Sequence, residues 1–289
     1  MEQREMLKAA ASTLFFVAPR AAAMRKVLYF TRSAGFEHSV VQRQGAEFSH
    51  SERLLAEIGR KAGFDVESTK DGRIFEGSLD AFDVIAFYTS GDLTQPAKDG
   101  SPPMTQAGKQ KLLDAISAGK GFVGFHSATD SFRSQDPPDR NPEQVDPYIA
   151  MIGGEFLMHG EEQEAALLLT TRNFPGIRNL GVAEGLAFTE EWYTFRSFAP
   201  DLHVIIIQET QMMRGDAYRR PDYPQTWARL HGKGRVFYTS MGHRKDIWTN
   251  PFFQAIVAGG LEWAGGLADA KVPPNMDAVT PRARQLKNP

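Results

Sequence analysis

The sequence predicts an α/β fold with a mostly parallel central sheet, helices on both faces and some antiparallel strands in the second half. Two observations predict it. From Lys26 onward, strand-like and helix-like segments alternate, which is the pattern of parallel strands joined by crossover helices. The run at residues 121–125 is short and apolar throughout, as in a strand buried on both faces. With 289 residues, of which 42% are hydrophobic, the chain is long enough for one large domain or two small ones, and one is favoured.

The first half contains most of the predicted parallel strands. Leu54, Leu55 and Ile58 fall on one face of a helix at residues 49–62. A second helix is opened by Thr105 and closed by Gly119, a residue typical of helix C-termini. Strands are expected at residues 26–31, 64–69, 82–88 and 121–125. The stretch 134–147 is rich in Pro, Asp, Asn and Gln, which indicates a loop or lid rather than a core element.

The second half is expected to be more antiparallel. Strands are predicted at residues 164–171, 186–194, 203–209 and 234–240, followed by an amphipathic helix at 252–263. The domain is expected to cover residues 25–265. Residues 266–289 are Pro-rich and polar, which predicts a loosely held C-terminal tail.

Residues 1–24 differ from the rest of the chain. Residues 4–8 read R-E-M-L-K, an apolar run follows, and A-A-A at residues 21–23 looks like an export cleavage site. The segment resembles a twin-arginine leader in which Gln3 replaces the first arginine. Export to the periplasm is one interpretation; a translation start at Met24, giving a cytoplasmic protein, and a structured helix are the others. We expect the segment to be peripheral, and its apolar run is too short to span a membrane.

Composition and charge exclude several classes of protein. The formal net charge is −2, with basic and acidic residues interspersed, so nucleic acid and anionic membranes are poor partners and a small polar ligand is expected. The absence of cysteine excludes thiol catalysis, thiolate metal sites and disulfides. Any metal must therefore bind through His, Asp or Glu.

The segment GFVGFHSATDSF places polar side chains at the end of a buried strand. His126, Ser127 and Asp130 follow the apolar run, and the carboxyl ends of strands in open α/β sheets are where ligands bind. A nucleophile elbow is not formed, because the spacing G-x-S-x-G is absent and His126 fills the elbow position. Ser127 is interpreted as a turn or helix-capping hydroxyl rather than a nucleophile.

Ionisable residues occur at further predicted strand ends. His38 follows the first strand, Glu191 lies in the second half, and His243 follows the last strand. Their spacing does not form a metal motif such as H-E-x-x-H, and each histidine alone could be a structural hydrogen-bonding residue. Because parallel strands end at the same edge of a sheet, we expect His38, His126, Glu191 and His243 to face one crevice, with His159 close by.

A family resemblance is carried by several segments together. In chain order they are KVLYFTRSAGFEHS, GFVGFHSATDSF, MIGGEFLMHG, TEEWYTF and WARLHGKGRVFYTSMGH. They resemble the ThuA-like family, named for a trehalose-utilisation protein, over most of residues 25–265. The resemblance implies a flavodoxin-like sheet related to class I glutamine amidotransferases. His126 stands where those relatives carry their cysteine, so ammonia release from glutamine through a thioester is excluded.

The resemblance also implies functional positions. His38 matches the family's G-F-x-H, His126 its G-F-H, His159 its G-G-x-F-x-x-H, Glu191 its D-E-x-Y, and His243 its late G-H. The chain departs from the family at Glu190, which is usually Asp, and at Gly160, where a proline commonly follows the histidine. These departures leave Glu191 and His159 available, while the shapes of their turns stay open.

Members of the family appear beside sugar dehydrogenases that make 3-keto sugars. The resemblance therefore implies action on a carbohydrate or an oxidised (3-keto) sugar, as a hydrolase, lyase or isomerase. Histidine transfers protons near neutral pH and binds metals, and C–H bonds beside a keto group are acidic. We expect His126, Glu191 and His159 to be catalytic, and His38, His126 and His243 to bind a divalent metal such as zinc.

The expected partner is a small-molecule sugar, and a homo-oligomer is left open. The residues expected to bind the sugar are Ser127, Asp130, Trp192, Tyr193 and Trp227. For the aromatic residues, packing in the core is the alternative. A non-catalytic carbohydrate-binding or accessory protein is the alternative function. A two-carboxylate glycosidase is disfavoured because Glu190 and Glu191, adjacent on a strand, point to opposite faces.

Overall fold

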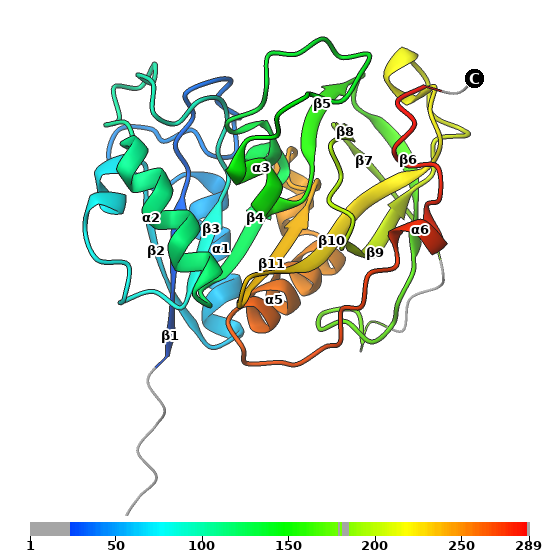
Figure 1. Cartoon of the computed structure of the whole chain (residues 1–289). Coiled ribbons are helices and arrows are strands. Elements are labelled where there is room, and N and C mark those ends of the chain that lie inside the picture. Colours follow the sequence, from blue (N-terminus) through cyan, green and yellow to red (C-terminus); the bar gives the residue numbers. More distant parts are fainter. Residues whose placement is uncertain (1–23, 179, 181–184, 288–289) are drawn as a thin grey trace, which may run out of the picture.

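The computed structural model describes residues 24–178, 180 and 185–287, and within them nine strands form one large sheet (Figure 1). Its strands are β1 (Arg25–Phe30), β2 (Phe64–Thr69), β3 (Val84–Phe87), β4 (Gly121–Phe125), β6 (Gln163–Leu169), β7 (Gly185–Glu190), β9 (His203–Gln208), β10 (Tyr223–His231) and β11 (Gly234–Thr239). They lie in the order β2-β1-β3-β4-β11-β10-β9-β6-β7. A small sheet pairs β5 (Glu155–His159) with β8 (Tyr193–Arg196).

The large sheet is parallel in one half and antiparallel in the other. Strands β2, β1, β3, β4 and β11 are parallel neighbours. Strands β10, β9, β6 and β7 each run antiparallel to the strand before them in the sheet. The α/β fold and the antiparallel second half are confirmed, but the sheet is half parallel rather than mostly parallel.

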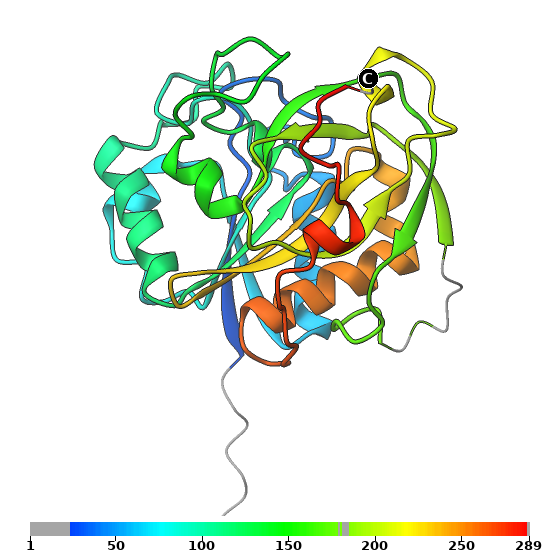
Figure 2. The ribbon, with the colours of Figure 1, turned by 45° about the vertical axis from the view of Figure 1, so that its right-hand side comes forward.

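Helices cover both faces of this sheet (Figures 1 and 2). They are α1 (His50–Lys61), α2 (Gln106–Ser117), α3 (Pro147–Ile152), α4 (Lys245–Thr249), α5 (Pro251–Ala264) and α6 (Met276–Val279), with short 3-10 helices η1 (Gly72–Glu76), η2 (His126–Asp130) and η3 (Asp216–Tyr218). Helices α1, α4 and α5 share a core with Val27 and Tyr29, whereas α2, α3 and α6 share one with Leu28 and Phe30. Consecutive β1 side chains thus enter opposite cores.

Local sequence signals set the ends of the helices. Ser49 caps α1 in a reciprocal capping box with Glu52. Thr105 caps α2 and Asn250 caps α5 through their side-chain oxygens. Gly119 follows α2 with φ of 130°, a conformation that residues with a side chain avoid. The three helices predicted from the sequence are confirmed.

Residues 186–194, predicted as one strand, belong to two. The chain leaves the large sheet at the end of β7 and enters the small sheet at Tyr193. The sequence pattern also fails to predict β5 and β10. The latter begins with Tyr223 and Pro224, and its pairing with β9 is irregular from Pro224 onward, because proline lacks the backbone N–H that a regular ladder uses.

The C-terminal segment packs against the sheet, so the expectation of a loosely held tail is wrong. The Asn275 side chain accepts a hydrogen bond from the N–H of Val204 (2.6 Å) and donates one to its carbonyl (3.0 Å). Met276 and Ala283 are buried, and Arg220 donates to the carbonyl of Ala283 (2.8 Å). Figure 2 shows this segment in red on the outside of the molecule. These contacts hold the segment against the domain even though its composition is polar.

Residues 1–23, interpreted above as a leader, lie outside the described residues. Among the helices of the described part, none has the length and apolar character needed to cross a lipid bilayer.

Candidate metal centre

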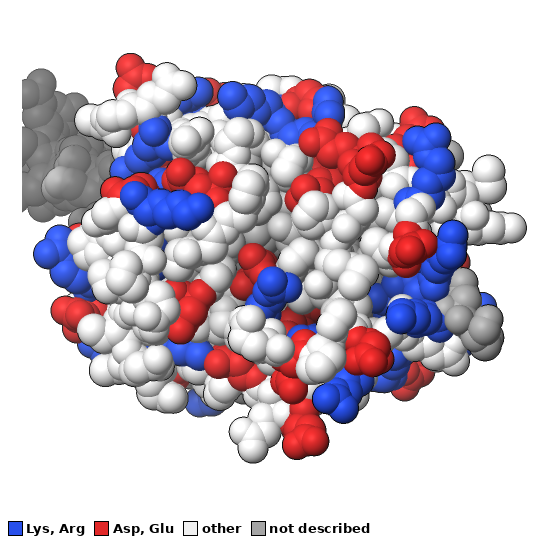
Figure 3. Space-filling view, turned by 90° about the horizontal axis from the view of Figure 1, so that it is seen from above, with Lys and Arg blue, Asp and Glu red and all other residues white. Residues whose placement is uncertain are grey.

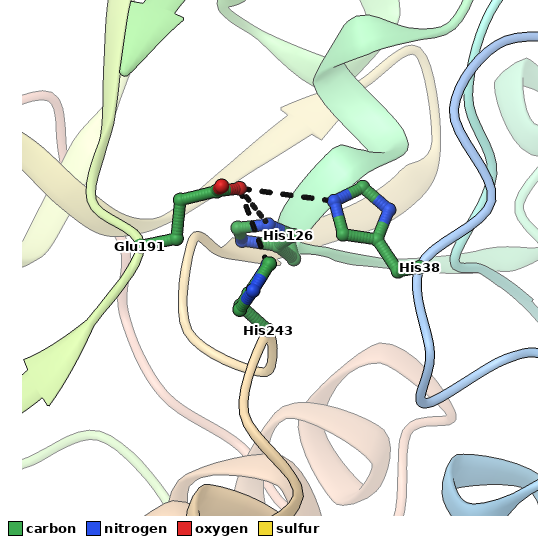
Figure 4. A group of neighbouring side chains, drawn as sticks. All are labelled: His38, His126, Glu191 and His243. Carbon is green, nitrogen blue, oxygen red and sulfur yellow. Dashed lines mark hydrogen bonds and ion pairs between the residues drawn. The ribbon is translucent and has the colours of Figure 1, made fainter. Parts of the chain in front are cut away.

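Three histidines and one glutamate meet at the edge of the sheet that lies at the top of Figure 1. His126 directly follows β4, His243 follows β11, and His38 lies in the loop after β1. Glu191 lies between β7 and β8, where the chain crosses from one sheet to the other. One nitrogen or oxygen from each of the four lies within 4.8 Å of all the others (Figure 4). The crevice expected from the sequence is therefore present in the structure.

A single oxygen of Glu191 is the meeting point of these side chains. Glu191 Oε2 lies 3.3 Å from His126 Nε2, 3.2 Å from His243 Nδ1 and 3.8 Å from His38 Nε2. The other oxygen, Oε1, lies 3.3 Å from Nδ1 of His159. His159 is thus not one of the four clustered residues but contacts one of them, Glu191.

The loop that carries His38 is fixed by the loop after β3. Ser90 donates its hydroxyl proton to the carbonyl of Phe36 (2.6 Å) and accepts the N–H of Ala34 at its carbonyl (2.9 Å). The two loops touch at Gly91, which has φ of 74° and whose Cβ, if present, would lie 2.4 Å from the nitrogen of Gly35. Only glycine permits this approach.

The orientation of His126 determines which nitrogen faces Glu191. Its Nδ1 lies 2.7 Å from the carbonyl of Ser240, and because a carbonyl only accepts, Nδ1 carries the proton. Burial lowers the pKa of His126 to about 3, so the ring takes up no second proton near neutral pH. Nε2 therefore presents a lone pair to Glu191.

The electrostatics leave Glu191 negative and most of the imidazoles neutral. Burial alone would raise the pKa of Glu191, but the neighbouring imidazoles of His126, His243 and His38 hold it well below the usual range. Burial lowers the pKa of His38. For His243, burial would lower the pKa, but Glu191 raises it above its ordinary value. Burial thus favours neutral imidazoles at His38 and His126, whereas the carboxylate of Glu191 favours a proton on His243.

These residues fit a divalent metal ion. His126 Nε2 and Glu191 Oε2 both carry lone pairs and face each other at 3.3 Å, an arrangement that a cation between them would stabilise. The buried His243 Nδ1, which also faces Glu191, makes no hydrogen bond in the described structure. Imidazole nitrogens and a carboxylate oxygen are ligands for zinc and other first-row transition metals. The four candidate ligands are therefore His38, His126, His243 and Glu191.

A cavity of about 460 Å³ opens beside the cluster. Its lining includes His38, His159, Glu191 and Tyr193, together with Asp130. Burial raises the pKa of Asp130 to about 6, even though the Arg133 guanidinium, 2.9 Å away, lowers it. The cavity therefore joins the candidate metal ligands to further groups that titrate or donate hydrogen bonds.

A larger hollow, of about 1110 Å³, lies at the opposite edge of the sheet. Arg25 at the start of β1 and Lys120 just before β4 line it, so it faces the amino ends of the parallel strands. In the described residues the candidate metal-binding cluster is not there but beside the smaller cavity. The smaller cavity is therefore the candidate functional site.

Of the residues expected to bind substrate, the structure places some at the cavity and others in the core. Asp130 and Tyr193 line the cavity. Trp192 and Trp227 are fully buried, and their ring N–H groups donate to the carbonyls of Gln163 and Ile152, both at 2.8 Å. The expectation that these two tryptophans face a sugar is not met; they adopt the alternative, core packing. Ser127 is also buried, outside the cavity lining.

Several cavity residues were not singled out from the sequence. They are Phe36, Asp92, Arg133, Gln135 and Phe156. Asp92 follows a predicted strand, so the strand-end argument that selected His126 applies to it equally. Phe36 neighbours His38 in the motif G-F-E-H and is 68% exposed, which is unusual for a phenylalanine. Phe156 lies on β5, which the pattern did not predict.

Comparison with known proteins identifies the family. A family model described as ThuA, trehalose utilisation, matches residues 26–264. The chain belongs to the ThuA family. A comparison with curated proteins finds no significant match.

Solved structures, two of them of ThuA-like proteins, share the fold. One from Parabacteroides merdae is 14% identical, with a TM-score of 0.60 over 92% of this chain and 99% of its own. Another, from Bacteroides uniformis, is 18% identical, with a TM-score of 0.56 over 86% of this chain and 95% of its own. A cytoplasmic protein of Salmonella typhimurium is 12% identical, with a TM-score of 0.52 over 83% and 99%.

Proposed function

We propose that this ThuA-family protein is a metal-assisted enzyme that acts on a carbohydrate, in particular an oxidised (3-keto) sugar. The observation that carries the proposal is the convergence of His38, His126, His243 and Glu191 beside a cavity of about 460 Å³. A cluster of metal-binding side chains that opens into a concave pocket is typical of an active site.

We also infer that the parallel half of the sheet is flavodoxin-like and related to class I glutamine amidotransferases. The order β2-β1-β3-β4-β11 corresponds to the flavodoxin-like order 2-1-3-4-5. In that arrangement ligands bind outside the carboxyl ends of the strands, where His126 follows β4. The strand order supports the inference through topology alone.

The surface around the cavity supports a small and uncharged ligand. Figure 3 looks onto the face formed by the carboxyl ends of the parallel strands, and acidic and basic side chains are interspersed over it. The exposed ring of Phe36 at the cavity could pack against the apolar face of a sugar ring. Asp130 and Arg133 offer hydrogen bonds to hydroxyl groups.

The proposed chemistry begins with removal of a proton from the carbon next to the keto group. His159 is the base: its Nδ1 faces the carbonyl of Gly160 (2.9 Å) and carries a proton, which leaves Nε2 as the basic atom. The C–H electron pair forms a carbon–carbon double bond, and the carbonyl oxygen takes the negative charge. A divalent ion would supply positive charge to stabilise that oxygen. Where the deprotonated carbon carries a hydroxyl group, its O–H proton passes to the enolate oxygen, the abstracted proton returns to the former carbonyl carbon, and the keto group moves to the neighbouring carbon, which completes an isomerisation. In an elimination the C=O bond re-forms, the electron pair of the double bond shifts to the bond with the β-carbon, and the substituent leaves with its bonding electrons and takes up a proton.

The metal centre can be tested before the substrate is known. Metal content is measured in the wild type, in His126→Ala and in His203→Ala after identical zinc supplementation. His203 is the matched control, because it is also a buried histidine whose Nδ1 faces a backbone carbonyl, that of Pro273 (2.8 Å). We expect about one metal per chain in the wild type and in His203→Ala, and a loss in His126→Ala. Wild type that binds no divalent metal on titration would contradict the proposal.

Turnover separates an enzyme from an accessory protein. The metal-loaded wild type is incubated with glucosides and with 3-keto-glucosides, and products are followed by mass spectrometry. We expect conversion of the keto sugars, and we expect His159→Ala to lose it while keeping its metal, since His159 approaches the cluster only through Glu191. Sugar binding without conversion would instead identify a carbohydrate-binding accessory protein.

A further inference from the structure

His243 is oriented differently from the other histidines of the cluster. His38 and His126 face Glu191 with Nε2, whereas His243 faces it with Nδ1. A ring that coordinates through Nδ1 must carry its proton on Nε2. Nε2 of His243 points to the carboxylate of Glu162, with Oε1 at 3.2 Å.

We infer that Glu162 is a positioning residue of the metal centre: it holds the His243 ring so that Nδ1 faces the metal. The inference rests on the metal site of the proposed function and adds to it a residue outside the cluster. A carboxylate that accepts the second N–H of a metal-bound imidazole fixes its tautomer and rotation and increases its basicity.

The backbone of His243 is already held by a different group. The buried carboxylate of Glu190 accepts the N–H of Gly242 (3.1 Å) and that of Arg244 (3.2 Å), the residues on either side of His243. These bonds fix the loop but do not determine how the ring turns about its side-chain bonds. Glu162 supplies that missing constraint.

Glu162 is itself held in place from the far side. Its Oε2 lies 2.5 Å from Nη1 of Arg244, and Nε of Arg244 lies 3.0 Å from Asp246. These charged side chains, of Glu162, Arg244 and Asp246, line an open hollow together with His243. The outer side of His243 therefore faces solvent, away from the main cavity.

Partial exposure limits the size of the effect. Glu162 is 41% exposed, so water can replace part of its role when the carboxylate is removed. Loss of such a partner typically weakens metal affinity by about 10–100-fold. We expect a change of about tenfold, near the lower end of that range.

The test compares zinc affinity in four proteins by competition with a chromophoric chelator: wild type, Glu162→Ala, Glu162→Gln and Glu161→Ala. Glu161 is the matched control: it is the neighbouring exposed glutamate, and among the described contacts it contributes its backbone carbonyl alone, to a hydrogen bond with Gln163. We expect Glu162→Ala to bind zinc about tenfold more weakly. Glu162→Gln, which keeps an acceptor oxygen, should stay within about threefold of the wild type, and Glu161→Ala should equal it.

A spectroscopic measurement separates ring positioning from a general loss of stability. In the zinc-loaded wild type, the Nε2 proton of His243 should be protected from exchange and visible in ¹H–¹⁵N spectra. It should be lost in Glu162→Ala and kept in Glu162→Gln. Equal zinc affinity in Glu162→Ala and wild type would overturn the inference, and so would an equal loss in the Ala and Gln variants, which would indicate charge alone. Wild type without zinc binding would instead overturn the proposed function.

Discussion

The carboxylates of Glu190 and Glu191 are adjacent in the chain but have opposite environments. Glu190 is buried and accepts backbone N–H groups from Gly242, Arg244 and Glu191. Burial raises the pKa of Glu190 to about 8, while the histidine contacts lower that of Glu191. One carboxylate therefore supports the loop of His243, and the other faces the cavity. They do not form an acid pair around a common substrate bond.

Replacing Glu190 with glutamine should change how stability depends on pH. The folded-state pKa of about 8 lies above the ordinary value of 4.5, so ionisation of this group costs folded stability progressively as pH rises from about 5 to 8. Glutamine does not ionise. The stability of Glu190→Gln relative to wild type should therefore increase over this range by a few kcal/mol.

Urea unfolding in the presence of a chelator, at pH 5 and pH 8, measures this change. At pH 5 the variant should be the less stable protein by about 1–3 kcal/mol, because the glutamine amide can no longer accept all three backbone N–H groups. A stability difference that does not change with pH would show that Glu190 is already ionised in the fold.

Arg196→Met should destabilise the fold strongly. The buried guanidinium donates to the backbone carbonyls of Asp136, Pro137 and Arg140 and lies 3.0 Å from the buried carboxylate of Glu155. Removing it leaves that carboxylate unpaired, at a cost of about 3–5 kcal/mol. Chemical denaturation of the single variant and of Arg196→Met combined with Glu155→Gln measures the effect. The double variant should recover part of the loss; equal losses would contradict an unpaired buried charge as the cause.

Trp227→Phe should affect stability and leave the metal centre intact. The Trp227 ring packs against Tyr238, with ring centroids 4.3 Å apart, and its N–H donates to the buried Ile152 carbonyl. The smaller ring leaves a void and an unsatisfied carbonyl, which should lower the free energy of unfolding by about 2–3 kcal/mol. Denaturation curves and zinc titration check the two parts. A stable variant with weakened ligand binding would restore the sugar-binding role first expected from the sequence.

Asn275→Ala should show that the C-terminal segment contributes to the fold. The side chain both donates to and accepts from the backbone of Val204 on β9. Its loss removes the acceptor of the Val204 N–H and one of two donors to the Val204 carbonyl, which keeps the Thr170 hydroxyl, and should cost about 1–3 kcal/mol. Asp277→Ala is the control in the same segment, since Asp277 is exposed and pairs only with Arg284 among the described contacts. Thermal melting of both variants should separate them; equal melting temperatures would mean that Asn275 does not anchor the segment.

The strand-end argument predicted His126 well because one short segment contains both the buried strand and the polar side chains that follow it. It also placed His38 and His243, which follow β1 and β11 at the same edge. Glu191 could be placed at the edge only as an expectation, since it depends on the chain changing sheets between β7 and β8. That crossing requires β5 as a partner for β8, and β5 gives no clear signal in the sequence.

The roles of the aromatic residues could not be decided from the sequence. Trp192 and Tyr193 are neighbours, yet one is buried with its N–H on Gln163 and the other lines the cavity beside His126. Which of two adjacent rings faces a ligand depends on the local backbone direction, and no composition or periodicity reveals it. The same limit applies to Arg133, whose place beside Asp130 depends on the path of an irregular loop.

The four clustered side chains come from positions 38, 126, 191 and 243, spread over most of the domain. The cluster is therefore complete only after the large sheet has been assembled from its first strand to β11, and no contiguous part of the chain much shorter than the domain can contain it. A ligand bound by all four would bind the folded chain and not the unfolded one, and so would raise the melting temperature with its concentration. The melting temperature would then report occupancy of the site without any knowledge of the substrate.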